Sequence, residues 1–420
     1  IRFVGDEYVG MHVQHLLGGR RAMKLSRVCV KFALMAAAIA VIPIGLAACG
    51  DSTSPSTSSS TEAGSYKIGA VLSLTGTYAA LGEAEKNAIE LEVARINDAG
   101  GINGRQLEVI IEDDATDEAK AVAAAAKLIE QEEVVALIGA SGTGQTMAMR
   151  GDVDRAGLAQ ISLAGGTVVT SEFDSFVFQT PWSNTIVVPF VLDAMKTAGH
   201  SKIAVISDTG GYGKDGLAVI EADVADFDMT IVANETFNPG DSDVTAQLTK
   251  IKKSGADAVL LWTAGKEGAI TLKNAADLGL EAPFFGGSGQ ARTEFIEGAG
   301  DAAEGFVFGT GKSLVPANWG EDSEQFAVVT DFATRYTEKY GEAPDIFAGH
   351  AFDAMTLLSD ALTRAGADAD AAAIRDALEA TDGVVGFGGT FTFSATDHNG
   401  LTADDLALYE ITNGAWAAAK

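Results

Sequence analysis

Six short loops rich in glycine and hydroxyl residues are the segments of this sequence most able to bind a ligand. Hydroxyl groups and free backbone N–H groups at the start of a helix bind anions, and glycine lets a ligand approach the backbone. A single loop of this kind is typical of an ordinary turn, whereas six of them favour a binding cleft. Each loop follows an apolar run: 73–78, 139–143, 163–167, 208–213, 262–265 and 286–289.

Three groups of residues resemble catalytic, cofactor or metal motifs, but none is complete or in the right context. Residues 211–216 match the GxGxxG of a dinucleotide site, but the leader described below predicts export, away from soluble nicotinamide cofactors. Residues 311–313 end like a phosphate-binding loop, yet Phe306 replaces the first glycine that this loop requires. The histidines of the body have no metal-ligand spacing: His200, His350 and His398. We therefore expect no enzyme activity, no cofactor and no metal.

The elements that position the six loops follow a regular alternation. Short apolar runs alternate with helix-like stretches in two consecutive series, 67–156 and 184–286. This pattern is typical of βαβ units, and two series favour two doubly wound lobes. Long helices are expected at 321–340 and 346–365, followed by a β-rich tail at 390–412. The predicted fold class is therefore α/β, with two parallel-sheet lobes whose strands end at the loops.

Charge separates the start of the chain from the rest. The 420 residues have a net charge of −29, although residues 1–49 carry six Lys or Arg against two Asp or Glu. An acidic body lacks the basic face that a nucleic-acid backbone requires. Hydrophobic residues make up 47% of the chain, which is typical of a folded core. We expect an acidic globular body behind a basic leader, with no nucleic-acid partner.

The leader has the features of a secretory signal peptide. Three basic residues follow Met23, and the apolar run 32–48 is shorter than a membrane span. The run ends in Leu-Ala-Ala-Cys49, which resembles the lipobox of bacterial lipoproteins, so Cys49 is the predicted lipidation site. Residues 1–22 precede this start and are expected to be upstream sequence.

A tether and a cysteine-free body follow the leader. Residues 50–65 are rich in Ser and Thr and have little apolar surface to bury, which predicts a flexible segment. The sequence has no cysteine after Cys49, so disulfides and thiolate metal sites are excluded from the body. We expect the body to be held at the outer face of the cytoplasmic membrane, through the lipid alone.

Several segments of the body resemble the branched-chain amino-acid (Leu/Ile/Val) binding proteins of ABC importers, lipoprotein form. The most distinctive is 67–114, with its turn Asn97-Asp-x-Gly-Gly-Ile-Asn-Gly104, and the likeness continues through 134–139, 204–213, 257–280 and 352–354. This family implies a type I periplasmic-binding fold, in which two lobes joined by a three-strand hinge close on a small ligand. The implied domains are 66–184 plus 313–395 for lobe 1, and 185–312 plus 396–420 for lobe 2.

The resemblance also implies a binding site. The hydroxyl and N–H that hold the ligand carboxylate in the family fall on Thr143, at the start of a predicted helix. A backbone carbonyl falls on Ala164, and a second hydroxyl falls on Gly166, with Thr167 adjacent. The family's aromatic residues in the second lobe and late in the chain fall on Tyr212 and Phe347.

This sequence departs from the family at four positions of the site. The acid that binds the ligand ammonium falls on Ser288, which carries no charge. The other three departures are an aromatic that falls on Leu81 near Tyr78, an aromatic that falls on Ala264 near Trp262, and an acid that falls on Asn184. Burying an ammonium without a carboxylate is costly. The ligand is therefore not necessarily a branched-chain amino acid: an amide, a urea-like solute or a carboxylate without an amine fits as well.

Two functions remain open at this point. The first is an extracytoplasmic solute-binding lipoprotein that delivers a small amino-acid-like or related polar solute to an ABC permease. The second is a ligand-sensing ectodomain partner of a signalling system, because type I folds also serve receptors. An exported hydrolase is not favoured, since no nucleophile and base occur together.

Overall fold

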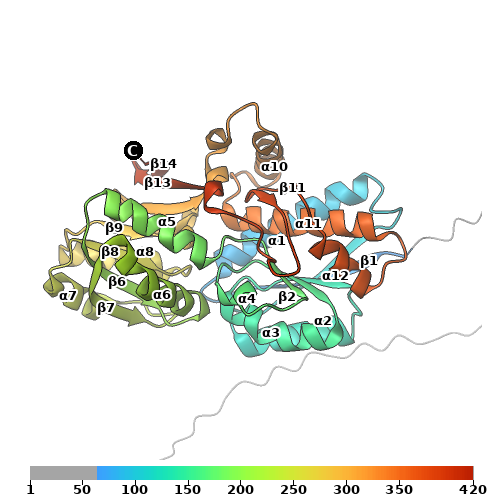
Figure 1. The fold of residues 1–420 in the computed structure, drawn as a ribbon, viewed down its shortest axis with the longest axis horizontal. Coiled ribbons are helices and arrows are strands. Elements are labelled where there is room, and N and C mark those ends of the chain that lie inside the picture. The colour runs from blue at the N-terminus through green and yellow to red at the C-terminus, as the bar shows by residue number, and fades with distance from the viewer. Residues whose placement is uncertain (1–63, 420) are drawn as a thin grey trace, which may run out of the picture. The chain divides into compact units, whose positions relative to one another are not determined.

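Two β-sheets organise residues 64–419, the part of the chain that the computed structural model describes (Figure 1). The first sheet is parallel throughout, with strand order β2-β1-β3-β4-β5. Its strands are β1 (Tyr66–Leu72), β2 (Leu107–Asp113), β3 (Ala136–Gly139), β4 (Ala159–Ser162) and β5 (Val177–Gln179). The predicted signal peptide, Cys49 and most of the tether lie outside the described residues.

The second sheet is mixed, with strand order β14-β13-β10-β9-β8-β6-β7. Its strands β6 to β10 are parallel where they pair, whereas β13 runs antiparallel to β10 and β14 antiparallel to β13. The prediction of parallel sheets therefore holds for strands β6 to β10 of this sheet and not for its last two strands, β13 and β14. The strands are β6 (Lys202–Asp208), β7 (Thr230–Phe237), β8 (Ala258–Trp262), β9 (Phe284–Gly286), β10 (Val307–Gly311), β13 (Leu406–Thr412) and β14 (Ala415–Ala418). A separate hairpin pairs β11 (Val384–Val385) with β12 (Thr390–Phe391).

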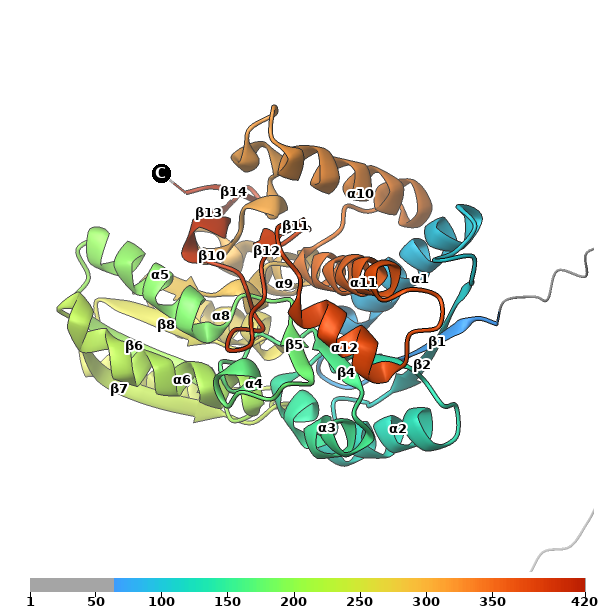
Figure 2. The same cartoon turned by 45° about the vertical axis from the view of Figure 1, so that its right-hand side comes forward.

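Helices cover both sheets. We call the first sheet with α1–α4, α10–α12 and the β11–β12 hairpin the first lobe, and the second sheet with α5–α9 the second lobe. In the first lobe, α2 and α3 pack together on one side of the sheet and α1 packs with α11 on the other (Figures 1 and 2). The helices are α1 (Ala79–Asp98), α2 (Glu118–Glu130), α3 (Thr143–Ala156), α4 (Val168–Ser171), α5 (Asn184–Thr197), α6 (Gly211–Asp223), α7 (Thr245–Ser254), α8 (Glu267–Leu278), α9 (Thr293–Ala299), α10 (Glu324–Tyr340), α11 (Ile346–Ala365) and α12 (Ala371–Glu379).

Local sequence signals explain where many of these elements begin. In β1, Ile68 and Leu72 are fully buried, as expected for a strand covered on both faces. Asp117, Asp345 and Asp370 each accept a hydrogen bond from a backbone N–H in the first turn of α2, α11 and α12. By contrast, α3 begins after Gly142, which offers no side-chain cap. Its first N–H groups are therefore left without a side-chain cap.

Three connections join the lobes, as the resemblance implies. They run from β5 to α5, from β10 to α10, and from β12 to β13. The third crosses the first, where Asn399 Nδ2 donates to the carbonyl of Pro181 at 2.7 Å. Tyr409 similarly donates to the carbonyl of Gly311 at 2.9 Å, next to the second connection. The residue bounds predicted for the two domains stay a prediction.

None of the described helices combines the length and hydrophobicity that crossing a membrane requires.

Candidate functional site

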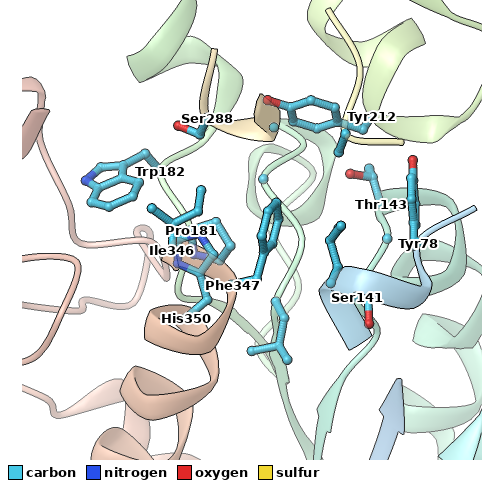
Figure 3. Close-up of a pocket in the computed structure, with 16 residues that line it drawn as sticks. Tyr78, Ser141, Thr143, Pro181, Trp182, Tyr212, Ser288, Ile346, Phe347 and His350 are labelled. Carbon is cyan, nitrogen blue, oxygen red and sulfur yellow. The ribbon is translucent and has the colours of Figure 1, made fainter. Parts of the chain in front are cut away.

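A hollow lies between the two lobes, where loops at the strand ends meet α11 (Figure 3). The register of the first sheet explains how the loops of the first lobe come together at the hollow: Val71 near the end of β1 pairs with Gly139 at the end of β3. The loops that follow both strands therefore begin at the same edge of the sheet. The lining residues are Tyr78, Leu81, Ser141, Gly142, Thr143, Leu163, Gly165, Pro181, Trp182, Tyr212, Ala264, Ser288, Gly289, Ile346, Phe347 and His350.

Thr143 is the polar side chain at the start of α3. Thr143 is only 2% exposed, and its Oγ1 has no hydrogen-bond partner among the described residues. Figure 3 shows this hydroxyl on the side of Thr143 that faces Phe347 and Tyr212. The unsatisfied N–H groups of the first helical turn add a partial positive charge at the same place. A negatively charged oxygen at this position would satisfy the hydroxyl and the N–H groups together.

Gly166 packs closely against the side chain of Thr143. A Cβ on Gly166 would lie 2.3 Å from Thr143 Cγ2, so a larger residue would displace the threonine. The shift of one residue suggested by the sequence does not bring Thr167 into the lining: its N–H donates instead to Asp215 of the second lobe, at 2.7 Å.

Apolar and aromatic groups form most of the remaining wall. Tyr212 of α6 stacks on Trp262, with ring centroids 6.1 Å apart. Burial raises the pKa of Tyr78 and of Tyr212, so both phenols keep their protons and can donate hydrogen bonds. The apolar part of the lining comes mainly from six residues: Leu81, Leu163, Pro181, Trp182, Ile346 and Phe347.

The lining has polar groups but no charged side chain among the described residues. Burial lowers the pKa of His350 to about 3, so its imidazole is neutral at ordinary pH. The resemblance places the family's acid at Ser288, whose hydroxyl donates to the Gly309 carbonyl at 3.4 Å. A ligand ammonium would therefore find no carboxylate in this wall.

One buried positive charge lies just behind the lining. Arg292 is 3% exposed, and its guanidinium carbon lies 6.0 Å from the centroid of the Phe347 ring. It donates a hydrogen bond to the carbonyl of Ala264, whose residue lines the hollow. Three acidic residues, Glu267, Glu294 and Asp345, lie near this charge and oppose it, so the start of α3 is the feature of the lining that favours an anion.

The structure brings five of the nine sequence-predicted ligand residues to the hollow: Tyr78, Thr143, Tyr212, Ser288 and Phe347. The other four contact protein groups instead. The Ala164 carbonyl accepts a hydrogen bond from Gln179 Nε2 at 2.8 Å, and Gly166 packs behind Thr143. Thr167 binds Asp215 as described above. Trp262 is 1% exposed beneath Tyr212, and its Nε1 donates to Asn184 Oδ1 at 3.2 Å. Ligand contact stays a prediction for all nine.

The sequence analysis missed several lining residues, most importantly Trp182 and His350. Trp182 lies on the first connection, which has no periodic pattern to reveal its role. His350 was not predicted to line the site, although it lies four residues after Ile346 and three after Phe347. This spacing places the three residues on one face of α11, which could have indicated a shared wall. No group of His, Cys, Asp or Glu within residues 64–419 is arranged to hold a metal ion.

Known proteins resemble this chain over most of its length. The sequence model of a periplasmic binding protein family matches residues 65–415. The "Leu/Ile/Val-binding protein homolog 3" of Brucella melitensis is 28% identical over 334 residues, which are 78% of this chain and 87% of the relative. The substrate-binding protein LivJ of the Streptococcus pneumoniae branched-chain amino acid transporter, solved with isoleucine, is 27% identical with a TM-score of 0.75, covering 84% of this chain and 98% of LivJ. An ABC-transporter solute-binding protein from R. palustris, solved with benzoate, is 25% identical with a TM-score of 0.75, over 84% of this chain and 95% of that protein.

Proposed function

Because the chain belongs to the periplasmic binding protein family, among the branched-chain amino-acid binding proteins of type I fold, we propose that it captures a small carboxylate solute for an ABC importer. Members of this family bind solutes and are not enzymes. They act outside the cytoplasm. The protein would bind its solute between the lobes and present the closed form to a permease. Binding favours the closed form only by the difference in ligand affinity between the two forms.

The observation that carries this proposal is the unpartnered hydroxyl of Thr143 at the uncapped start of α3. A buried hydroxyl without a partner costs free energy, and a bound oxyanion would remove that cost. The positive end of the helix favours an anion over a neutral amide or a urea-like solute. A carboxylate is therefore the ligand group that fits this part of the hollow best.

The rest of the hollow supports an apolar ligand body. Six apolar residues contribute to the lining, and Phe347 and Trp182 offer flat faces. The two solved relatives bind carboxylates of this kind, one with an amine (isoleucine) and one without (benzoate). The absence of an acidic side chain from the described lining favours the second kind for this protein.

Membrane attachment is the second part of the proposal. The lipobox predicts that Cys49 carries a lipid and holds the protein at the outer face of the cytoplasmic membrane. Incorporation of labelled palmitate into the wild type but not into Cys49→Ser tests this directly. Permease and ATPase genes beside this gene would favour transport over the alternative of a sensory partner, which neighbouring sensor-kinase genes would favour.

Mass spectrometry of small molecules released from the denatured, purified protein tests the ligand class. We expect a small carboxylate to be released in a near-stoichiometric amount. Calorimetric titration then compares leucine and isoleucine with amine-free carboxylates of similar size. Micromolar binding of leucine, with no binding of the amine-free acids, would contradict the proposed ligand class.

A further inference from the structure

His350 has the surroundings of a ligand-contacting residue. It lies on α11 in the wall of the hollow and is 2% exposed. Its Nδ1 has no hydrogen-bond partner among the described residues. Its backbone carbonyl, by contrast, accepts a hydrogen bond from Thr180 Oγ1 at 3.1 Å. The backbone of this residue is thus satisfied by the fold, whereas the imidazole is not.

Two aromatic rings restrict the orientation of the imidazole. The Trp182 ring lies edge-on to it, with centroids 5.5 Å apart, and the Phe347 ring lies edge-on at 6.1 Å. Because burial keeps the imidazole uncharged, one ring nitrogen donates a hydrogen bond and the other accepts one. A buried polar group of this kind costs free energy until a partner binds it. His350 lines the hollow, so a ligand bound there could supply this partner.

The other buried histidine shows what a purely structural role looks like in this protein. His398 is 1% exposed and stacks on Phe178, with ring centroids 4.1 Å apart. Its Nδ1 lies 2.9 Å from the carbonyl of Val177, and it does not line the hollow. The protein supplies a partner for one ring nitrogen of His398, whereas its buried Nε2 has none among the described residues. Because His398 lies away from the hollow, it is a control for the loss of a buried imidazole that cannot reach a ligand.

We propose that His350 is a specificity-determining residue, and that its imidazole binds a hydroxyl or carbonyl oxygen of an amine-free carboxylate. This inference rests on the proposed function, because Thr143 and α3 hold the carboxylate in both. An ammonium in place of the oxygen would need a negative partner, and the described lining has none. A hydroxyl both donates and accepts, so it can pair with either nitrogen of the imidazole. The ligand is thus a hydroxy- or oxo-carboxylate with an apolar body.

Two series of probes on constant skeletons test the inference. The first is 4-methylpentanoate with hydrogen, hydroxyl, oxo or amine at C2, the amine form being leucine. The second is benzoate with hydrogen or with a hydroxyl at C2, C3 or C4, which varies the distance between carboxylate and hydroxyl. We expect at least one hydroxy or oxo acid to bind the wild type about tenfold more tightly than its parent acid, the gain of one buried hydrogen bond.

Three variants test whether this gain in affinity comes from the side chain of His350. In His350→Phe, which keeps a flat ring, the gain should fall below about twofold while the parent acid binds as before. In His350→Gln, which keeps a donor and an acceptor, part of the gain should return. In His398→Phe the gain should be unchanged, although thermal stability falls. Thermal melts of the empty variants verify that each is folded.

The imidazole ¹⁵N resonances give a readout that stability does not affect. The best hydroxy acid should shift the His350 signals of the wild type, and its parent acid should not. Equal binding of hydroxy and parent acids, or a gain that survives in His350→Phe, would overturn the role of His350 and leave the proposed function intact. Tightest binding of leucine would also overturn it. If no carboxylate of either series binds, the carboxylate-binding function itself fails, and this inference fails with it.

Discussion

The carboxylate of Asp215 on α6 accepts a hydrogen bond from the backbone N–H of Thr167, at 2.7 Å, across the boundary between the lobes. The same carboxylate accepts from the N–H of Val168 at 3.1 Å and from Asn184 Nδ2 at 2.6 Å. The backbone of Thr167 thus joins the two lobes, whereas its hydroxyl has no hydrogen-bond partner among the described residues, and ligand contact through that hydroxyl stays a prediction. Because these hydrogen bonds join the two lobes that border the hollow, we expect them to contribute to ligand affinity without touching the ligand.

Replacing Asp215 by Ala should weaken ligand binding by roughly 5- to 50-fold, because charge-assisted hydrogen bonds across the boundary are lost. Calorimetric titration measures the affinity, and small-angle scattering measures whether the empty protein becomes more extended. Asp193→Asn removes the same charge from an exposed position on α5 and should change neither. An unchanged affinity in Asp215→Ala would show that these contacts do not help to enclose the ligand.

Gly211→Ala should block the contact between the lobes sterically. A Cβ on Gly211 would lie 2.4 Å from the backbone N of Gly144 and 2.9 Å from its Cα, on the opposite lobe. We expect ligand affinity to fall more than about tenfold while the melting temperature changes little, since alanine suits a helix better than glycine. Gly151→Ala is the control: its Cβ would meet nothing within 4 Å, so the variant should gain about 1 kcal/mol and bind normally. Normal binding by both variants would refute the steric block.

The fold was predictable where elements are long and repeat regularly. The helix at 346–365 begins and ends as expected, because Asp345 caps its start and its apolar positions recur at helical spacing. The strands β4 (Ala159–Ser162) and β5 (Val177–Gln179) were missed, since segments this short show no period. The antiparallel pairing of β13 and β14 depends on where the chain returns after β12, which local sequence does not encode.

The site was predictable at the strand ends and not beyond them. Thr143 and Tyr212 follow β3 and β6 directly, and parallel strands present their carboxyl ends at a common edge. Trp262 was expected to contact the ligand, but it is the last residue of β8 and packs into the core, while Ala264 reaches the hollow. His350 reaches the site only because α11 returns from late in the chain to lie against α1. Such long-range contacts leave no local pattern.

Thr143→Val should separate ligand binding from stability. Valine keeps the methyl group that packs against Gly166 and removes only the hydroxyl, which has no partner in the protein. We therefore expect carboxylate binding to weaken by about 10- to 100-fold, with an unchanged or higher free energy of unfolding. Titration calorimetry and urea denaturation measure the two effects.

Thr146→Val, one turn further along α3, is the matched control. The Thr146 hydroxyl lies 3.0 Å from Ser162 Oγ, so its loss should cost about 1 kcal/mol of stability and affect affinity less. If Thr143→Val destabilised the empty protein as much as Thr146→Val and bound carboxylates normally, a structural role for the Thr143 hydroxyl would replace the proposed one.

Asp345 couples the start of α11 to pH. It is 9% exposed and accepts a hydrogen bond from the N–H of Ala348 at 2.9 Å. Burial, with a smaller contribution from the carboxylate of Glu294, raises the pKa of Asp345 to about 7, although Arg292 opposes this shift. Between the pKa of an unfolded aspartate, about 3.9, and this value, the folded state keeps a proton that the unfolded state has lost.

The free energy of unfolding should therefore decrease as pH rises from about 4 to 7, by at most about 1.4 kcal/mol per pH unit from Asp345 alone. Asp345→Asn keeps a good helix cap without a titratable group. We expect this variant to match the wild type at or below about pH 4 and to become progressively more stable than it as pH rises, by about 1–3 kcal/mol near pH 7.5, in urea titrations at each pH. Asp345→Ser should follow the asparagine curve, because it also caps without titrating. The difference between variant and wild type isolates Asp345 from other buried acids whose pKa is raised, such as Glu85 and Asp353. A difference that stays constant with pH would show that Asp345 is ionised in the folded protein throughout this range.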